Sequence, residues 1–67
     1  MELISYDRLW KTLIDKHMKK TELRDVIGIS NATLAKMGKN DPVNLKIIEK
    51  ICRELNCKIE DVVEIIL

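Results

Sequence analysis

Apolar residues recur along most of this chain at intervals of three and four positions, which is the spacing of one face of an α-helix. An alternation typical of strands never persists beyond four residues, and the two glycines and the single proline fall between the periodic stretches. We therefore expect an all-α fold of five helices, at about residues 6–17, 21–27, 31–37, 45–55 and 59–67.

The apolar stripes of these helices define the expected core. Its members are Tyr6, Leu9, Trp10, Leu13, Ile14, Leu23, Val26, Ile27, Leu34, Met37, Leu45, Ile48, Ile51, Cys52, Leu55, Ile59, Val62, Val63 and Ile66, with His17 at the rim of the first stripe. A chain of 67 residues buries only about 60% of the surface that it exposes when unfolded. Such a thin core leaves little interior for an enclosed active-site pocket.

Short polar residues stand at the expected helix starts, where their side chains can accept hydrogen bonds from the first backbone amides. These N-caps are Ser5, Thr21, Ser30 and Asn44. Gly28 stops the second helix, and Gly38 fits the left-handed residue that closes the third. Asn56 is the expected end of the fourth helix.

The second and third helices, joined by about three residues around Gly28, match a helix-turn-helix unit at about residues 20–37. Gly28 permits the sharp turn, and Ile29 fills the angle between the helices. The second helix of such a unit can enter the major groove of DNA. We expect residues 1–67 to form a single compact domain around this unit.

The outer face of the third helix is expected to carry Asn31, Ala32, Thr33 and Lys36. All four are small or able to hydrogen-bond, and the helix contains no acidic residue. A solvated helix face more usually carries pairs of Glu and Lys. A face that meets phosphates and base edges must avoid acids.

At these residues the chain resembles the phage-repressor/Cro-like helix-turn-helix transcriptional regulators, and in particular their small single-domain bacterial members. The likeness covers roughly residues 5–66 and is carried by Thr21-Glu22-Leu23, the run from Gly28 to Met37, Asn44-Leu45, the run from Ile48 to Cys52, and Leu55-Asn56-Cys57 with Ile59, Asp61 and Val62. Arg24 departs from the pattern, because many of these regulators have a small Ala there. We expect its stem to run along the third helix and its head to end in water or on an acid.

The resemblance implies a DNA-binding surface on the second and third helices. Its expected members are Lys20 and Thr21 against the phosphate backbone, Asn31, Ala32 and Thr33 at base edges, Lys36, Lys39 and Asn40 along a phosphate strand, and Ser30 as a cap with a second phosphate role. Side-chain chemistry agrees, since Asn31 can pair with adenine through two hydrogen bonds and Lys36 can reach guanine or phosphate. Ordinary solvated lysines and first-turn polar residues are the alternative for these positions.

The net charge of +1 argues at first against a nucleic-acid partner. The charge is unevenly distributed, however: residues 16–39 contain six basic and two acidic residues, a net charge of +4. Residues 1–15 carry −1 and residues 40–67 carry −2. The positive charge is therefore concentrated in the expected helix-turn-helix unit.

Other classes of protein find little support. The chain has no Gly-rich phosphate loop, no paired carboxylates and no nucleophile motif, so we expect neither an enzyme nor a bound cofactor or small-molecule ligand. Cys52, Cys57 and His17 have poor spacing for zinc, and the cysteines are expected to be free, buried thiols. Without an apolar run of about 18 residues or a signal peptide, we expect a soluble cytoplasmic protein with no membrane contact.

The last apolar residues cannot all join one stripe, because Ile65 and Leu67 are left over beside Val63 and Ile66. We therefore expect a homodimer whose interface contains these four residues, and whose third helices enter successive major grooves of a palindromic operator about 34 Å apart. The expected function is that of a sequence-specific transcriptional regulator, acting as a dimeric repressor. The alternative is a helical protein–protein interaction module, an antitoxin-like or anti-regulator partner that retains the fold without DNA binding.

Overall fold

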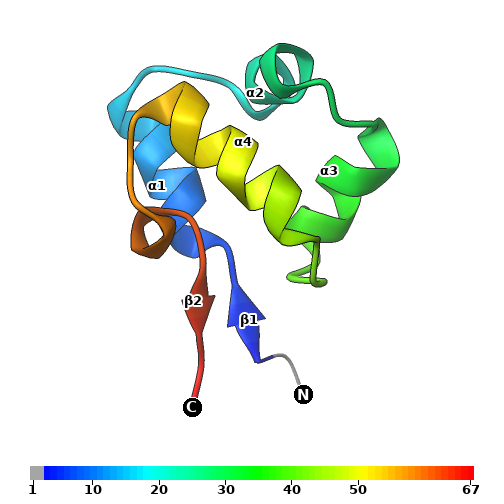
Figure 1. Cartoon of the computed structure of the whole chain (residues 1–67), viewed down its shortest axis with the longest axis vertical. Coiled ribbons are helices and arrows are strands. Elements are labelled where there is room, and N and C mark those ends of the chain that lie inside the picture. The colour runs from blue at the N-terminus through cyan, green and yellow to red at the C-terminus, as the bar shows by residue number, and fades with distance from the viewer. Residues whose placement is uncertain (1–2) are drawn as a thin grey trace.

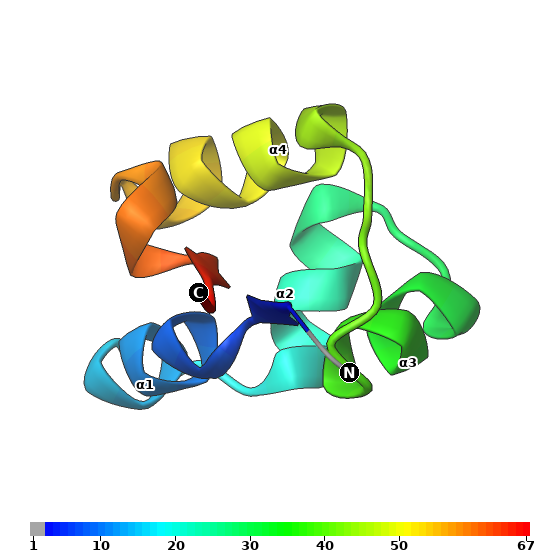
Figure 2. The ribbon, with the colours of Figure 1, turned by 90° about the horizontal axis from the view of Figure 1, so that it is seen from below.

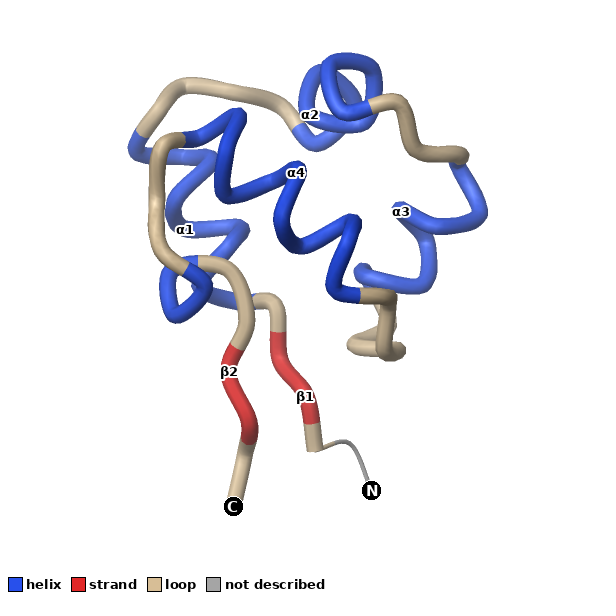
Figure 3. Tube along the Cα trace, in the orientation of Figure 1, coloured by secondary structure: helices blue, strands red, loops and turns tan. Residues whose placement is uncertain are grey.

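The computed structural model describes residues 3–67, and within them it contains four α-helices and one antiparallel pair of short strands (Figure 1). In chain order the elements are β1 (Ile4–Ser5), α1 (Asp7–Asp15), α2 (Lys20–Ile27), α3 (Asn31–Gly38), α4 (Leu45–Leu55), the 3-10 turn η1 (Ile59–Asp61) and β2 (Glu64–Ile65). The tube in Figure 3 shows the two strands together at the end of the molecule opposite α2.

The longest helix, α4, crosses the centre of the view in Figure 1 and lies along one side of the molecule in Figure 2. It packs on α2 and η1, while η1 also contacts α1 and α3 contacts α2. The core between these elements contains Tyr6, Leu9, Leu13, Leu23, Ile27, Met37, Ile48, Ile51, Leu55 and Val62. Leu23 on α2 and Met37 on α3 are both fully buried. The core therefore holds both helices of the helix-turn-helix unit from behind.

The expected fifth helix is wrong, because residues 59–67 form η1 and β2 instead. The consecutive β-branched residues Val62-Val63 and Ile65-Ile66 favour an extended chain over a helix. The extended chain also finds a partner, since Ile4 pairs with Ile65 in the antiparallel sheet. A helix of nine residues would be marginal by itself in water. The fold is thus mostly helical with a small two-stranded sheet, rather than all-α with five helices.

Several residues expected in the core lie at the surface. Ile14 is 71% exposed, Val26 53% and Leu45 74%. His17 is exposed as well, and Trp10 is half-buried. The expected stripes are too wide because each short helix contacts only a few neighbours, and residues at the edge of a stripe remain in water.

The expected helix ends at Ser30, Asn44 and Asn56 are confirmed. The side chain of Ser30 accepts a hydrogen bond from the Thr33 amide at 3.1 Å, and that of Asn44 accepts one from the Ile47 amide at 3.0 Å. Asn56 takes the left-handed conformation, with φ at 50°, directly after α4. Each of these signals depends on residues within a few positions, so the sequence alone can carry it.

Two expected N-caps are wrong. α1 begins at Asp7, and Ser5 belongs to β1, although the Ser5 hydroxyl still accepts a hydrogen bond from the Asp7 amide at 3.2 Å. α2 begins one residue before Thr21. Its first turn is closed by the Glu22 carboxylate, which accepts a hydrogen bond from the Lys19 amide at 3.1 Å.

The left-handed residue beyond α3 is Asn40, with φ at 60°, and not Gly38, which is the last residue of the helix. The Asn40 side-chain oxygen accepts a hydrogen bond from the Tyr6 amide at 3.2 Å, and the Tyr6 hydroxyl donates one to the Asp41 carbonyl at 2.7 Å. Burial raises the pKa of Tyr6, so the hydroxyl keeps its proton at neutral pH. These bonds tie the loop after α3 to the start of α1.

Two glycine substitutions test these backbone assignments in opposite directions. At Gly28 φ is +71° and an added Cβ meets no atom within 4 Å, so Gly28→Ala introduces only backbone strain and lowers the unfolding free energy by about 1–2 kcal/mol. Gly38→Ala also meets open space, but in helical backbone, and should raise the unfolding free energy by up to about 1 kcal/mol. Urea unfolding followed by circular dichroism measures both. Similar losses in the two variants would contradict the place of Gly38 within α3.

Candidate nucleic-acid interface

A turn of three residues sets the angle between α2 and α3. Gly28 is left-handed (φ 71°, ψ 39°), and its amide donates a hydrogen bond to the Arg24 carbonyl at 2.9 Å. The Ile29 amide donates to the same carbonyl at 3.2 Å, and its side chain is half-buried against the core. Ser30 then caps α3. The helix-turn-helix expected from the sequence is confirmed.

The exposed face of α3 carries small, amide and basic side chains. Asn31, Ala32, Ala35 and Lys36 are exposed, whereas Met37 is buried. Ala35 is absent from the sequence-based prediction, although helical spacing places it on the same face as Ala32. The two alanines let another molecule approach the helix backbone closely, since their side chains end at Cβ. α3 contains no acidic residue that would repel a phosphate.

Thr33 points outward less than expected, because it is half-buried. Its hydroxyl lies 3.0 Å from the Ser30 hydroxyl, and its amide donates to the same Ser30 oxygen. A hydroxyl offers one donor and two acceptor positions, so this pair can still bond to a third group. Ser30 and Thr33 thus form a polar unit at the N-terminus of α3.

Arg24 bridges α2 and the first residue of α3. Its Nε donates a hydrogen bond to the Asp25 carboxylate at 3.0 Å, and its Nη2 lies 3.0 Å from the same oxygen. Its Nη1 donates to the side-chain oxygen of Asn31. The Arg24 head therefore ends on an acid, as expected, but the bond to Asn31 was not predicted. Seven residues and a turn separate the two side chains, and their meeting depends on the angle between the helices.

The start of α2 carries two lysines and one acid. The Lys20 ammonium lies 4.2 Å from the centre of the Trp10 ring, a cation–π contact of about 0.5–1 kcal/mol at an exposed site. Thr21 and Lys19 are exposed beside it. The Glu22 carboxylate already accepts the hydrogen bond of the Lys19 amide. A phosphate at this end of α2 would therefore contact the side chains of Lys20 and Thr21 more readily than the backbone amide of Lys19, which is already hydrogen-bonded.

The remaining expected contacts follow α3. Lys39 is exposed, and Asn40 is half-buried with its side-chain oxygen bonded to the Tyr6 amide. The positive segment 16–39 does not lie wholly on one face. Lys16 lines a hollow beside α1 and η1, and α1 lies across the molecule from α3 (Figures 1 and 2).

A family model for the Cro/C1-type helix-turn-helix DNA-binding domain matches residues 8–67. The chain belongs to this family. Among solved structures, a crystal structure of the transcriptional regulator VanUg is similar to it, with a TM-score of 0.90 and 50% sequence identity. The match covers 92% of this chain and 83% of that chain. No curated protein matches the chain. The resemblance drawn from the sequence is confirmed.

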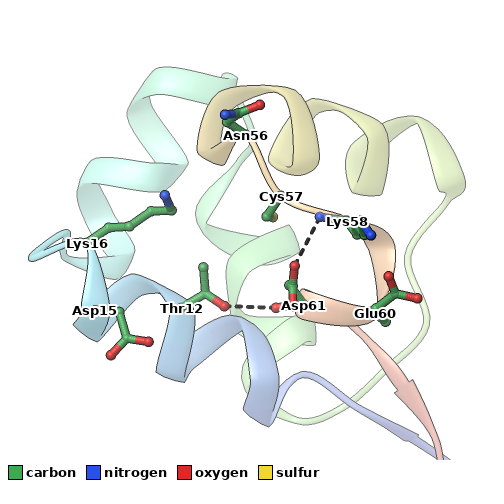
Figure 4. Close-up of a pocket in the computed structure, with 8 residues that line it drawn as sticks. All are labelled: Thr12, Asp15, Lys16, Asn56, Cys57, Lys58, Glu60 and Asp61. Atoms are coloured by element: carbon green, nitrogen blue, oxygen red, sulfur yellow. Dashed lines mark hydrogen bonds between the residues drawn. The ribbon is translucent and has the colours of Figure 1, made fainter.

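This Cro/C1-type domain has a polar hollow between α1 and η1, shown in Figure 4, which is lined by Thr12, Asp15, Lys16, Asn56, Cys57, Lys58, Glu60 and Asp61. The Thr12 hydroxyl lies 2.9 Å from the Arg8 carbonyl and 3.0 Å from the Asp61 carbonyl. The Lys58 amide donates a hydrogen bond to the Asp61 carboxylate at 3.1 Å. The bond from Thr12 to Asp61 holds η1 against α1, so polar groups of the hollow contribute to the fold.

The two cysteines of this Cro/C1-type domain, Cys52 and Cys57, are free and half-buried. Burial, with Cys52 close by, raises the pKa of the Cys57 thiol, so that it stays protonated and weakly nucleophilic at neutral pH. Within residues 3–67, no group of three or more His, Cys, Asp or Glu side chains is arranged to hold a metal ion. In the same part of the chain, no helix is both long and apolar enough to cross a membrane.

Two substitutions distinguish a true N-cap from a residue that only resembles one. Ser30→Ala removes the oxygen that accepts the Thr33 amide and should lower the unfolding free energy by about 1 kcal/mol. Thr21→Ala should change it by less than about 0.5 kcal/mol, because Thr21 is an exposed residue inside α2. Urea unfolding curves give both values. An equal loss in Thr21→Ala would restore Thr21 as the cap of α2.

Proposed function

We propose that this chain is a transcriptional regulator that binds specific DNA sequences, and that it acts as a dimeric repressor on a palindromic operator. The observation that carries the proposal is the acid-free, exposed face of α3 within a Cro/C1-type domain. The major groove is about 12 Å wide and admits one α-helix, so α3 can lie in it with this face toward the bases. Bound there, two copies would block access of polymerase to the same DNA.

The proposed contacts divide into two groups. Base edges meet the first exposed residues of α3, which are Asn31, Ala32 and Thr33. Phosphates meet the surrounding polar and basic residues, which are Lys20, Thr21, Ser30, Lys36, Lys39 and Asn40. Phosphate contacts fix the position and register of a protein on the duplex, whereas base contacts select the sequence. The partner is therefore double-stranded DNA, with no requirement for a cofactor.

A second surface supports association of two copies. Apolar side chains are exposed around β2 and the start of α4, and we call this surface the apolar end: Leu3, Leu45, Ile59, Ile65, Ile66 and Leu67. Three of them, Leu45, Ile59 and Ile65, line a groove of about 360 Å³, whose other lining residues are largely apolar and include Ile4, Tyr6, Val43, Ile48 and the half-buried Val63. Contiguous exposed apolar surface marks interaction sites in soluble domains. The proposed dimer contact comprises Val63, Ile65, Ile66 and Leu67.

The backbone of β2 favours a symmetric contact. The Ile66 amide donates a hydrogen bond to the Leu3 carbonyl at 2.8 Å, and alternation along an antiparallel strand then turns the amide and carbonyl of Ile65 away from β1. A second copy of β2 can pair with this outer edge about a two-fold axis. The same axis would repeat α3 with two-fold symmetry, which is the symmetry of a palindromic operator.

The salt dependence of DNA binding tests the role of Lys36. If its ammonium neutralises a phosphate, Lys36→Ala should weaken binding and reduce the slope of log affinity against log salt by about one unit. The measurement is fluorescence titration of a labelled duplex, selected from a random pool, at several salt concentrations.

Lys58→Ala is the matched control for Lys36→Ala. Lys58 belongs to the polar hollow between α1 and η1 (Figure 4), and α3 lies across the molecule from α1 (Figures 1 and 2). Lys58→Ala removes the same charge as Lys36→Ala, so an effect of total charge alone would appear in both variants. Equal slopes for Lys36→Ala and the unaltered protein would contradict the proposed phosphate contact.

Substitution at Ile65 tests the proposed dimer. Ile65→Asp places a charge within the apolar end and should convert the dimer to a monomer, with a dimer dissociation constant raised by at least about tenfold. Ile14→Asp, at an exposed isoleucine of α1 outside the apolar end, should leave the dimer intact. Sedimentation equilibrium measures both. A monomer at all concentrations for the unaltered protein would rule the dimer out.

A protein–protein interaction module is the second candidate function, and the apolar end is the observation that favours it. In that case no DNA sequence is selected and Lys36→Ala has no effect. Binding to a partner protein would instead be lost in Ile65→Asp. The two functions therefore differ in which of the two surfaces is sensitive to substitution.

A further inference from the structure

We propose that Arg24 orients the side chain of Asn31 so that α3 selects guanine, rather than adenine, at the base that Asn31 contacts. The inference rests on the proposed DNA-binding function and specifies what that same surface recognises. Asn31 is the first residue of α3 and is exposed. Its side-chain oxygen accepts a hydrogen bond from Nη1 of Arg24.

The orientation of the Asn31 carboxamide follows from the chemistry of its partner. A guanidinium has five N–H donors and no acceptor, so the atom that faces Arg24 must be Oδ1 and not Nδ2. Nδ2, on the other arm of the planar carboxamide, then keeps both of its N–H donors available, because the guanidinium has no acceptor for them. Asn31 therefore presents donors to a base.

Arg24 is itself held in a fixed direction. Two of its nitrogens, Nε and Nη2, lie 3.0 Å from one oxygen of Asp25, and its side chain is only 25% exposed. Exposed ion pairs contribute little to stability, and Asp25 is 68% exposed. The contribution of this pair is directional: Asp25 orients Arg24, and Arg24 orients Asn31.

Adenine and guanine place different demands on Asn31. The two-bond contact with adenine requires Oδ1 to accept from N6 while Nδ2 donates to N7. Oδ1 has two acceptor positions and Arg24 takes one of them, so the N6 amino group of adenine would have to approach beside the positively charged guanidinium, donor against donor. Guanine presents two acceptors, N7 and O6, which the hydrogens of Nδ2 can reach while Oδ1 stays on Arg24. The hydrogen bond from Arg24 to Asn31 therefore shifts the base preference of Asn31 from adenine to guanine.

Binding-site selection from a randomised duplex pool, with the full chain, tests this inference. The base contacted by Asn31 is identified as the position at which Asn31→Ala loses selection. The unaltered protein is expected to favour guanine over adenine there by at least about fivefold, which corresponds to about 1 kcal/mol. In Arg24→Ala the carboxamide can turn, and the preference should move to adenine.

Arg53→Ala is the matched control for Arg24→Ala. Arg53 is an exposed arginine on α4 that pairs with Glu49 at 3.4 Å, so its loss removes the same charge and a similar ion pair. The preference for guanine should be unchanged in this variant. An equal shift in Arg53→Ala would show that charge alone changes the selection, and the inference would be overturned.

A double-mutant cycle separates positioning from direct contact. If Arg24 acts through Asn31, Arg24→Ala has no effect on base preference in the Asn31→Ala background. The inference is overturned, with DNA binding intact, if the shift persists in that background, if Arg24→Ala still selects guanine, or if the unaltered protein selects adenine. If no variant selects any sequence, the proposed function fails and this inference fails with it.

A measurement without DNA examines the bridge directly. In NMR spectra of the free protein, Arg24→Ala should shift the side-chain amide signals of Asn31, while Arg53→Ala should leave them in place. The backbone amide spectrum reports in the same experiment that each variant is folded. Unshifted Asn31 side-chain signals in a folded Arg24→Ala variant would overturn the inference.

Discussion

The left-handed backbone at Gly28 is the constraint on which the rest of the structure depends. It turns the chain within three residues. The amides of Gly28 and Ile29 both donate hydrogen bonds to the Arg24 carbonyl of α2. With the angle between α2 and α3 set in this way, Leu23 and Met37 reach the same core, and α4 covers them from behind. The face of α3 opposite Met37 must then lie in solvent. The exposed position of Asn31, Ala32 and Lys36 is thus a consequence of the turn.

The features that the sequence predicted are local ones. Helical spacing placed four helices, and single polar residues such as Ser30 and Asn44 marked where two of them begin, because a cap bonds to an amide only three positions away. The helix-turn-helix and the outward residues of α3 followed from the same short-range signals. One local prediction was wrong: Asn40, rather than Gly38, takes the left-handed conformation beyond α3.

The features that the sequence missed depend on contacts between distant residues. The strand β2 exists because Ile4 lies beside Ile65, and no periodicity within either segment reports that pairing. The hydrogen bond from Arg24 to Asn31 depends on the angle between α2 and α3. The exposure of Leu45 depends on which elements pack around α4. These are properties of the tertiary arrangement. The count of charges along the chain likewise does not predict where each charge lies in space: Lys16 belongs to the positive segment 16–39 but lines a hollow beside α1.

The pairing of Ile4 with Ile65 encloses nearly the whole chain in one loop. The entropy lost on closing a loop grows with its length, and contacts between residues far apart in sequence slow folding. The helix-turn-helix unit, in contrast, is closed by neighbours within a few turns. The short-range contacts of α2 and α3 can therefore form first, and the strand pair that joins the two ends of the chain closes last. The angle between α2 and α3 does not have to wait until the two ends of the chain meet.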